Sequence, residues 1–165
     1  MSTDIPDVMR ALATVLREVV KGSSSKGGWL LNPDDPGLVR SLDTLSAAAA
    51  SAVPATGGAS IAAHVDHVKY GLELFNRWSR GEKDPFSGAD WSASWRRGTV
   101  SDAEWAALRD QLRAEADAWL QAVRTPRELS RVELTGILAS AAHMAYHLGA
   151  IRQIDPAARG PRARD

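Results

Sequence analysis

The chain has 165 residues, 44% of them apolar, which suits one globular domain with a sizeable core. Lysine plus arginine and aspartate plus glutamate each total 20, so no overall electrostatic attraction to nucleic acid or to an anionic membrane is expected. The absence of cysteine excludes disulfides, thiolate metal ligands and a cysteine nucleophile. Histidine and carboxylate groups remain as the candidate metal ligands.

The first predicted helix covers residues 5–20, where apolar side chains recur every three or four positions. The segment lacks the basic start and long apolar core of a signal peptide. No later run approaches the roughly 20 apolar residues that a membrane helix needs. We therefore expect a cytoplasmic protein that makes no membrane contact.

A loop rich in glycine, serine and proline follows, and we expect it to pack back so that Trp29, Leu30 and Leu31 are buried. Residues 38–53 are alanine-rich with leucines in helical register, and they predict a second, shorter helix that ends at Pro54.

Three longer helical patterns complete the chain. The first runs from about 61 to 79 after the capping residue Ser60, the second from 101 to 126, and the third from 130 to 154. Residues 82–100 hold too many turn formers for a helix and too many aromatic residues for a disordered linker, which predicts an ordered loop.

No segment shows sustained strand alternation, so the predicted fold is all-α. Long helices joined by ordered loops favour an antiparallel four-helix bundle with an additional short helix. We expect one domain over residues 1–157 and a flexible tail over 158–165.

Histidine is the residue type that carries the functional signal. His143 and His147 are four positions apart, which places them one turn apart on the same helix face, among small side chains that leave space for a ligand. His64 and His67 both lie on the apolar side of the 61–79 helix. Three neutral imidazoles with an open position suit a zinc-type catalytic site, whereas the alternative is a set of buried structural histidines.

Two stretches resemble the DinB/YfiT-like family of four-helix-bundle metalloenzymes: "SIAAHVDHVKYGLELFNRW" and "HMAYHLGAIRQ". In that family a histidine follows the serine by seven positions, which is His67 here, and a final H-x-x-x-H pair falls on His143 and His147. The resemblance implies that these three histidines bind the metal. Geometry alone leaves His64 open as the ligand in place of His67. The family's glycine, which permits close helix packing, falls on Gly149.

The resemblance also implies an activity, because characterised relatives include transferases and isomerases that use low-molecular-weight thiols. A divalent ion, Zn²⁺ or Ni²⁺, then ionises the thiol for attack on an electrophile. A metal-dependent hydrolase needs the same ligands. A non-catalytic stress-response or binding module with a structural histidine cluster is the other alternative, because no carboxylate shares the faces of the ligands as a general base.

Other residues carry weaker hypotheses. We interpret Trp91 and Trp95 as core residues. The alternative is that they form a wall or lid of the site together with the neighbouring Asp90. The site is expected to open into a pocket bounded by residues 82–100. Arg152 is a candidate for holding a substrate carboxylate or for complementing a helix dipole. Candidate outer donors are Tyr70, Asn76 and Tyr146. No catalytic residue is identified, and we expect a small-molecule substrate, no nucleic-acid partner and a homodimer.

Overall fold

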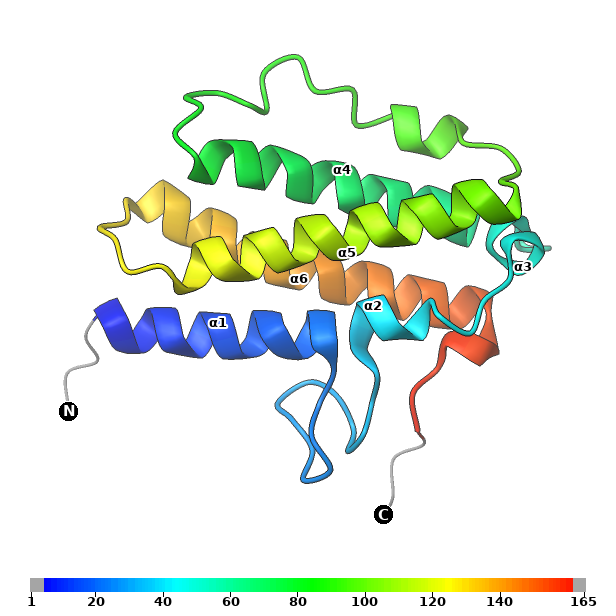
Figure 1. The fold of residues 1–165 in the computed structure, drawn as a ribbon, viewed down its shortest axis with the longest axis horizontal. Coiled ribbons are helices and arrows are strands. Elements are labelled where there is room, and N and C mark those ends of the chain that lie inside the picture. Colours follow the sequence, from blue (N-terminus) through cyan, green and yellow to red (C-terminus); the bar gives the residue numbers. More distant parts are fainter. Residues whose placement is uncertain (1–4, 162–165) are drawn as a thin grey trace.

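The computed structural model describes residues 5–161, in which helices and loops account for everything but one isolated bridge between Ser24 and Gly27. Four long helices form the bundle in Figure 1, namely α1 (Ile5–Lys21), α4 (Ile61–Ser79), α5 (Asp102–Arg124) and α6 (Arg131–Ile154). The predicted all-α helical bundle is confirmed. Within residues 5–161, no helix combines the length and the apolar character needed to cross a membrane.

The order of packing brings α4 and α6 together. α4 packs against α5 and α6, and α1 packs against the same two helices. Figure 1 shows that α4 and α5 run in one direction and that α1 and α6 run in the opposite direction, because the segment between α4 and α5 crosses back along the bundle. The two histidine-bearing helices are therefore antiparallel neighbours.

Serine side chains set where the later helices begin. Ser60 accepts a hydrogen bond from the backbone of the first turn of α4, and Ser101 and Ser130 do the same for α5 and α6. Glu104 and Glu133 complete capping boxes at α5 and α6. In each box the serine side chain accepts a hydrogen bond from the backbone N–H of the glutamate, and the glutamate side chain accepts one from the backbone N–H of the serine. Fixed starting points hold the register of the histidines along α4 and α6.

A close approach between α6 and α4 occurs at Gly136. A Cβ atom there would lie 2.7 Å from the ring of Trp78, so only glycine fits without a shift of the tryptophan. The expectation that Gly149 serves this purpose was wrong, because nothing lies within 4 Å of a Cβ atom at that position. Trp119, buried nearby, donates from Nε1 to Ser140 Oγ at 2.9 Å and links α5 to α6.

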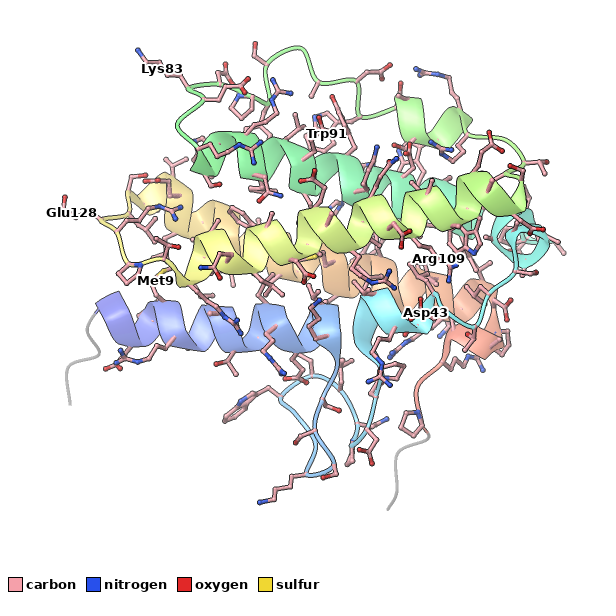
Figure 2. The ribbon with its side chains drawn as sticks, viewed as in Figure 1. Met9, Asp43, Lys83, Trp91, Arg109 and Glu128 are labelled. Atoms are coloured by element: carbon pink, nitrogen blue, oxygen red, sulfur yellow. The ribbon has the colours of Figure 1, made fainter. Side chains whose placement is uncertain are left out.

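The helix predicted over 38–53 is two short helices, α2 (Gly37–Ser41) and α3 (Ala47–Ser51). The break follows from Ser46, which adopts an extended conformation and caps α3 by accepting a hydrogen bond from the backbone N–H of Ala49. Asp43, in the break, pairs with Arg109 of α5 at 3.3 Å (Figure 2). This ion pair thus connects the segment between α2 and α3 to α5.

The loop after α1 packs back, but of the three apolar side chains expected to be buried only Leu31 packs against the core. Trp29 is 82% exposed and Leu30 is 55% exposed, so the prediction that they are buried was wrong. The buried carboxylate of Glu18 accepts hydrogen bonds from the backbone N–H groups of residues 29, 30 and 31 at 2.7–2.8 Å. Backbone groups hold the loop against α1, Trp29 and Leu30 are left outside, and Leu31 is partly buried against the core.

The end of the chain is described as far as residue 161. A short 3₁₀ helix, η2 (Pro156–Ala158), follows α6, and Ala158 is buried. Asn32 donates to the carbonyl of Pro161 at 3.1 Å. Of the tail predicted to be flexible, residues 162–165 lie outside the described residues.

Candidate metal centre

The four histidines meet at the interface between α4 and α6. His64 and His67 come from α4, and His143 and His147 come from α6. His67 and His147 are buried, whereas His64 and His143 are half-buried. The three-histidine cluster (His67, His143 and His147) offers one ligand atom per residue, and these atoms all lie within 4.8 Å of one another.

Within the cluster the Nε2 atoms face each other. His67 Nε2 and His143 Nε2 are 3.2 Å apart, and His143 Nε2 and His147 Nε2 are 2.9 Å apart. The sequence hypothesis placed these three residues in one site, and the structure brings them together. That they bind a metal stays a prediction.

The spacing fits a divalent ion. With metal–nitrogen bonds of about 2.0–2.1 Å, ligand nitrogens lie about 3.0 Å apart around an octahedral ion and about 3.4 Å apart around a tetrahedral one. Hydrogen bonding alone satisfies the cluster poorly, because each nitrogen of a neutral imidazole carries either one N–H or one lone pair. Nε2 of His143 faces two such nitrogens at once. Three lone pairs directed at one cation would satisfy all three atoms.

The electrostatics keep the cluster neutral. Burial lowers the pKa of all four histidines below the ordinary value of 6.5. The pKa of His147 falls to about 3, first because of burial and then because of the charges that His143, His64 and His67 would carry. Neutral imidazole is the form that binds metals, so these rings need lose no proton at neutral pH.

Tryptophans of the α4–α5 segment cover the cluster. The ring of Trp95, in the 3₁₀ helix η1 (Ala93–Arg96), stacks on His67 with ring centroids 4.5 Å apart. Trp91 lies 5.8 Å from His67, and Figure 2 shows it between this segment and α4. Trp91 is 39% exposed and Trp95 is 41% exposed, so both form a wall of the site rather than core.

An ion pair fastens this wall to α4. Arg97 follows η1 and donates to Asp66 Oδ1 at 2.9 Å, next to His67 in the sequence. The pKa of Asp66 is lowered, because hydrogen bonds from Ser94 and Arg97 and the charges of Lys69 and Arg97 outweigh the burial that would raise it. Asp90 pairs with Arg96 on the outside of the same segment. Asp90 therefore stabilises the fold of the wall and does not face the cluster.

The space beside the cluster is small. A cavity of about 10 Å³ lies next to His143 and holds one water at most. Its lining includes Gly71, Ser140 and Met144. Only α4 and α6 line this cavity, and none of residues 82–100 does, so the expected pocket bounded by residues 82–100 stays a prediction.

Two of the weaker sequence hypotheses were wrong, those for Asn76 and for Arg152 as a residue that holds a substrate carboxylate, whereas the outer-donor roles of Tyr70 and Tyr146 stay predictions. Asn76 donates to the backbone and side chain of Glu115 and so links α4 to α5 instead of contacting the cluster. Arg152 pairs with the buried Asp35, with one N···O distance of 3.0 Å, and is not free for a substrate carboxylate. Tyr146 meets His147 edge to ring at 5.0 Å but is 69% exposed. Tyr70 contacts Trp91.

Sequence reasoning missed the contact that the fourth histidine makes. It weighed His64 only as a rival ligand, whereas His64 Nδ1 lies 2.8 Å from His147 Nδ1, on the side of that ring away from the cluster. The helical wheel indicates which face a side chain occupies. It does not indicate which ring nitrogen meets which neighbour, because that depends on side-chain rotation and on the separation of the helices.

Comparison with known families places these residues in context. The sequence profile of the DinB superfamily matches residues 37–151, more than two thirds of the chain. The chain belongs to the DinB superfamily. The match begins at α2 and includes all four histidines, and it leaves out α1 and the loop that Glu18 holds.

No curated protein and no solved structure matches this DinB superfamily chain. Membership and the three-histidine cluster are both compatible with metal binding. Among residues 5–161 no carboxylate hydrogen-bonds to any of the four histidines, so no candidate general base is held directly against the cluster.

Proposed function

We propose that this DinB superfamily protein is a metal-dependent enzyme in which His67, His143 and His147 bind one Zn²⁺ or Ni²⁺. Its substrate is a small molecule, and a low-molecular-weight thiol is the nucleophile in a transfer or isomerisation reaction. The observation that carries this proposal is the convergence of three Nε2 atoms, two pairs of which are 2.9 and 3.2 Å apart. When bound, the ion lowers the pKa of a thiol or water so that it is ionised at neutral pH.

The residues of the chain would orient and shield the reaction. α4 and α6 would hold the ion through three imidazoles, and a further ligand would bind at a position that these residues leave open. Trp95 stacks on His67 and limits the access of water to that ring. Trp91 and Trp95 present half-exposed apolar faces that suit the carbon skeleton of a substrate.

A non-catalytic module is the second candidate. It is supported by the absence, among residues 5–161, of a carboxylate hydrogen-bonded to the histidines and by the small volume beside His143. In that case the ion would stabilise the packing of α4 against α6 and no substrate would bind.

Metal analysis followed by a thiol-binding assay tests the proposal. Protein purified without chelator or histidine tag should hold about one divalent ion per chain. In Co²⁺-loaded protein, free cysteine should produce a sulfur-to-metal absorption band, and His147→Ala should lack it. Protein that takes up neither Zn²⁺ nor Ni²⁺ would refute the metal site. Metal binding without a thiol band would favour a metal-dependent hydrolase or the non-catalytic module.

We also propose a homodimer. The outward side chains of α6 include Val132, Leu138 and Tyr146, each more than half exposed. No charged residue occurs between Glu133 and Arg152, so the part of this helix that carries Leu138 and Tyr146 could pack against a second copy without burying a charge. Sedimentation should show a dimer at micromolar concentration, and Leu138→Lys should shift it to monomer. A wild-type monomer under these conditions would contradict the dimer.

A further inference from the structure

Both ring nitrogens of His147 face other imidazoles. Its Nδ1 lies 2.8 Å from His64 Nδ1, and its Nε2 lies 2.9 Å from His143 Nε2. The side chain is 2% exposed, so water is not a ready substitute for either partner. A neutral imidazole has one N–H and one lone pair, so only the tautomer with its proton on Nδ1 leaves the Nε2 lone pair for a metal.

We propose that His64 is a positioning residue for the metal centre. Its Nδ1 accepts a hydrogen bond from Nδ1–H of His147 and thereby holds that ring in the tautomer and orientation that direct Nε2 at the ion. Histidine ligands generally need such a partner on the nitrogen that does not bind the metal, usually a carboxylate or a carbonyl. Here another imidazole takes that place. The inference rests on the proposed metal site and assigns to His64 a role other than that of a ligand.

The geometry distinguishes this role from ligation. His64 is absent from the group whose ligand atoms lie within 4.8 Å of one another. Nδ1 of His64 is already within hydrogen-bond distance of Nδ1 of His147. Trp95 packs edge-on against the His64 ring at 5.4 Å, which limits its rotation toward the cluster.

The buried His147 ring also depends on a hydrogen-bond partner within the protein, because a ligand in contact with solvent could use water instead. His147 is the most buried of the three ligands, at 2% exposure against 8% for His67, so its ring has little contact with solvent that could fix the tautomer. Nδ1 of His67 is buried and makes no hydrogen bond of ordinary geometry. Burial lowers the pKa of the His67 ring, and the backbone of Trp91 lies close enough to act against this larger effect by raising the pKa. The hydrogen bond at His147 therefore distinguishes this ligand.

Two substitutions of similar size test the role. In His64→Asn, the side-chain oxygen occupies about the position of Nδ1 and can accept the same hydrogen bond, whereas His64→Leu fills the space without an acceptor. We expect Zn²⁺ affinity within about threefold of wild type for His64→Asn. We expect a loss of about 10- to 100-fold for His64→Leu, the usual effect of removing an outer partner of a metal ligand. Competition with a chromophoric chelator measures both, and circular dichroism confirms the helical fold of each variant.

Nuclear magnetic resonance supplies a readout that a purely structural role would not change. In Zn²⁺-loaded wild type and His64→Asn, the ring ¹⁵N signals of His147 should show a protonated Nδ1 in slow exchange with water. In His64→Leu that proton should exchange faster.

The outcomes separate the hypotheses. Equal affinity in all three proteins would overturn the positioning role. Equal losses in His64→Asn and His64→Leu would overturn it too, because they would indicate that His64 itself binds the metal. Wild-type protein that takes up no Zn²⁺ would overturn the proposed metal site and, with it, this inference.

Discussion

Glu18 and the three-histidine cluster are both buried polar features, and they differ in how their polar atoms are satisfied. Glu18 is 5% exposed, and its carboxylate accepts three backbone hydrogen bonds. In the cluster, Nε2 of His143 faces two other ring nitrogens, and Nδ1 of His67 makes no hydrogen bond of ordinary geometry. The fold supplies partners to both carboxylate oxygens of Glu18, whereas three Nε2 atoms of the cluster face one another, an arrangement compatible with a bound ion.

This difference separates a structural role from a functional one. Buried polar groups are nearly always hydrogen-bonded, and exceptions call for an explanation. A satisfied group such as Glu18 should matter for stability and not for ligand binding. An unsatisfied, converging group should matter for ligand binding and add little to the stability of the metal-free protein.

Replacing a ligand should have the largest effect. His143→Ala and His147→Ala should each weaken Zn²⁺ binding by more than about 100-fold, because even an outer partner of a ligand contributes about 10- to 100-fold. For the half-buried His143, the free energy of unfolding of the metal-free protein should change by about 1 kcal/mol or less, whereas His147→Ala should cost about 2–3 kcal/mol, because it leaves a cavity and removes the hydrogen bond to His64. Calorimetric titration and urea denaturation measure the two quantities. Loss of stability with unchanged affinity would reverse the assignment of roles.

Glu18→Ala should give the opposite result. Three backbone N–H groups lose a charged acceptor, so the free energy of unfolding should fall by about 2–3 kcal/mol. Zn²⁺ affinity should stay unchanged. Arg17→Ala, at the exposed neighbouring position on α1, is the matched control and should stay within about 0.5 kcal/mol of wild type. A stable Glu18→Ala protein would show that the loop needs no such anchor.

Acid should destabilise the metal-free protein through the histidines. Their folded-state pKa values lie below 6.5, so the unfolded chain binds more protons and stability falls as pH decreases below 6.5. The loss between pH 6.5 and 4.5 should be about 2 kcal/mol, allowing for the solvent that reaches the half-exposed rings.

His147→Gln tests the origin of that acid sensitivity. His147 has the pKa lowered furthest, to about 3, so its removal should flatten the dependence of stability on pH between 6.5 and 4.5. Urea denaturation at several pH values in the presence of a chelator measures the slope. An unchanged slope in His147→Gln would place the acid sensitivity elsewhere.

Features with a regular period were predictable from the sequence. The spacing of four placed His143 and His147 on one face of α6, and serine caps located the starts of α4 and α5. The position of Trp29 was not predictable by the same means, because its exposure depends on a hydrogen bond from its backbone N–H to Glu18. That residue is 11 positions away and belongs to no repeating pattern with Trp29. The contact between His64 and His147 depends on the side-chain rotation of two residues that lie 83 positions apart and on different helices.

X-ray absorption of the Zn²⁺-loaded protein tests the central claim most directly. The account predicts one ion per chain with three imidazole nitrogens at about 2.0–2.1 Å and at least one further light ligand from solvent. The three-imidazole signal should persist in His64→Asn and be lost in His147→Ala. Four imidazole ligands in the wild type, or a spectrum that His147→Ala leaves unchanged, would contradict a centre built by His67, His143 and His147.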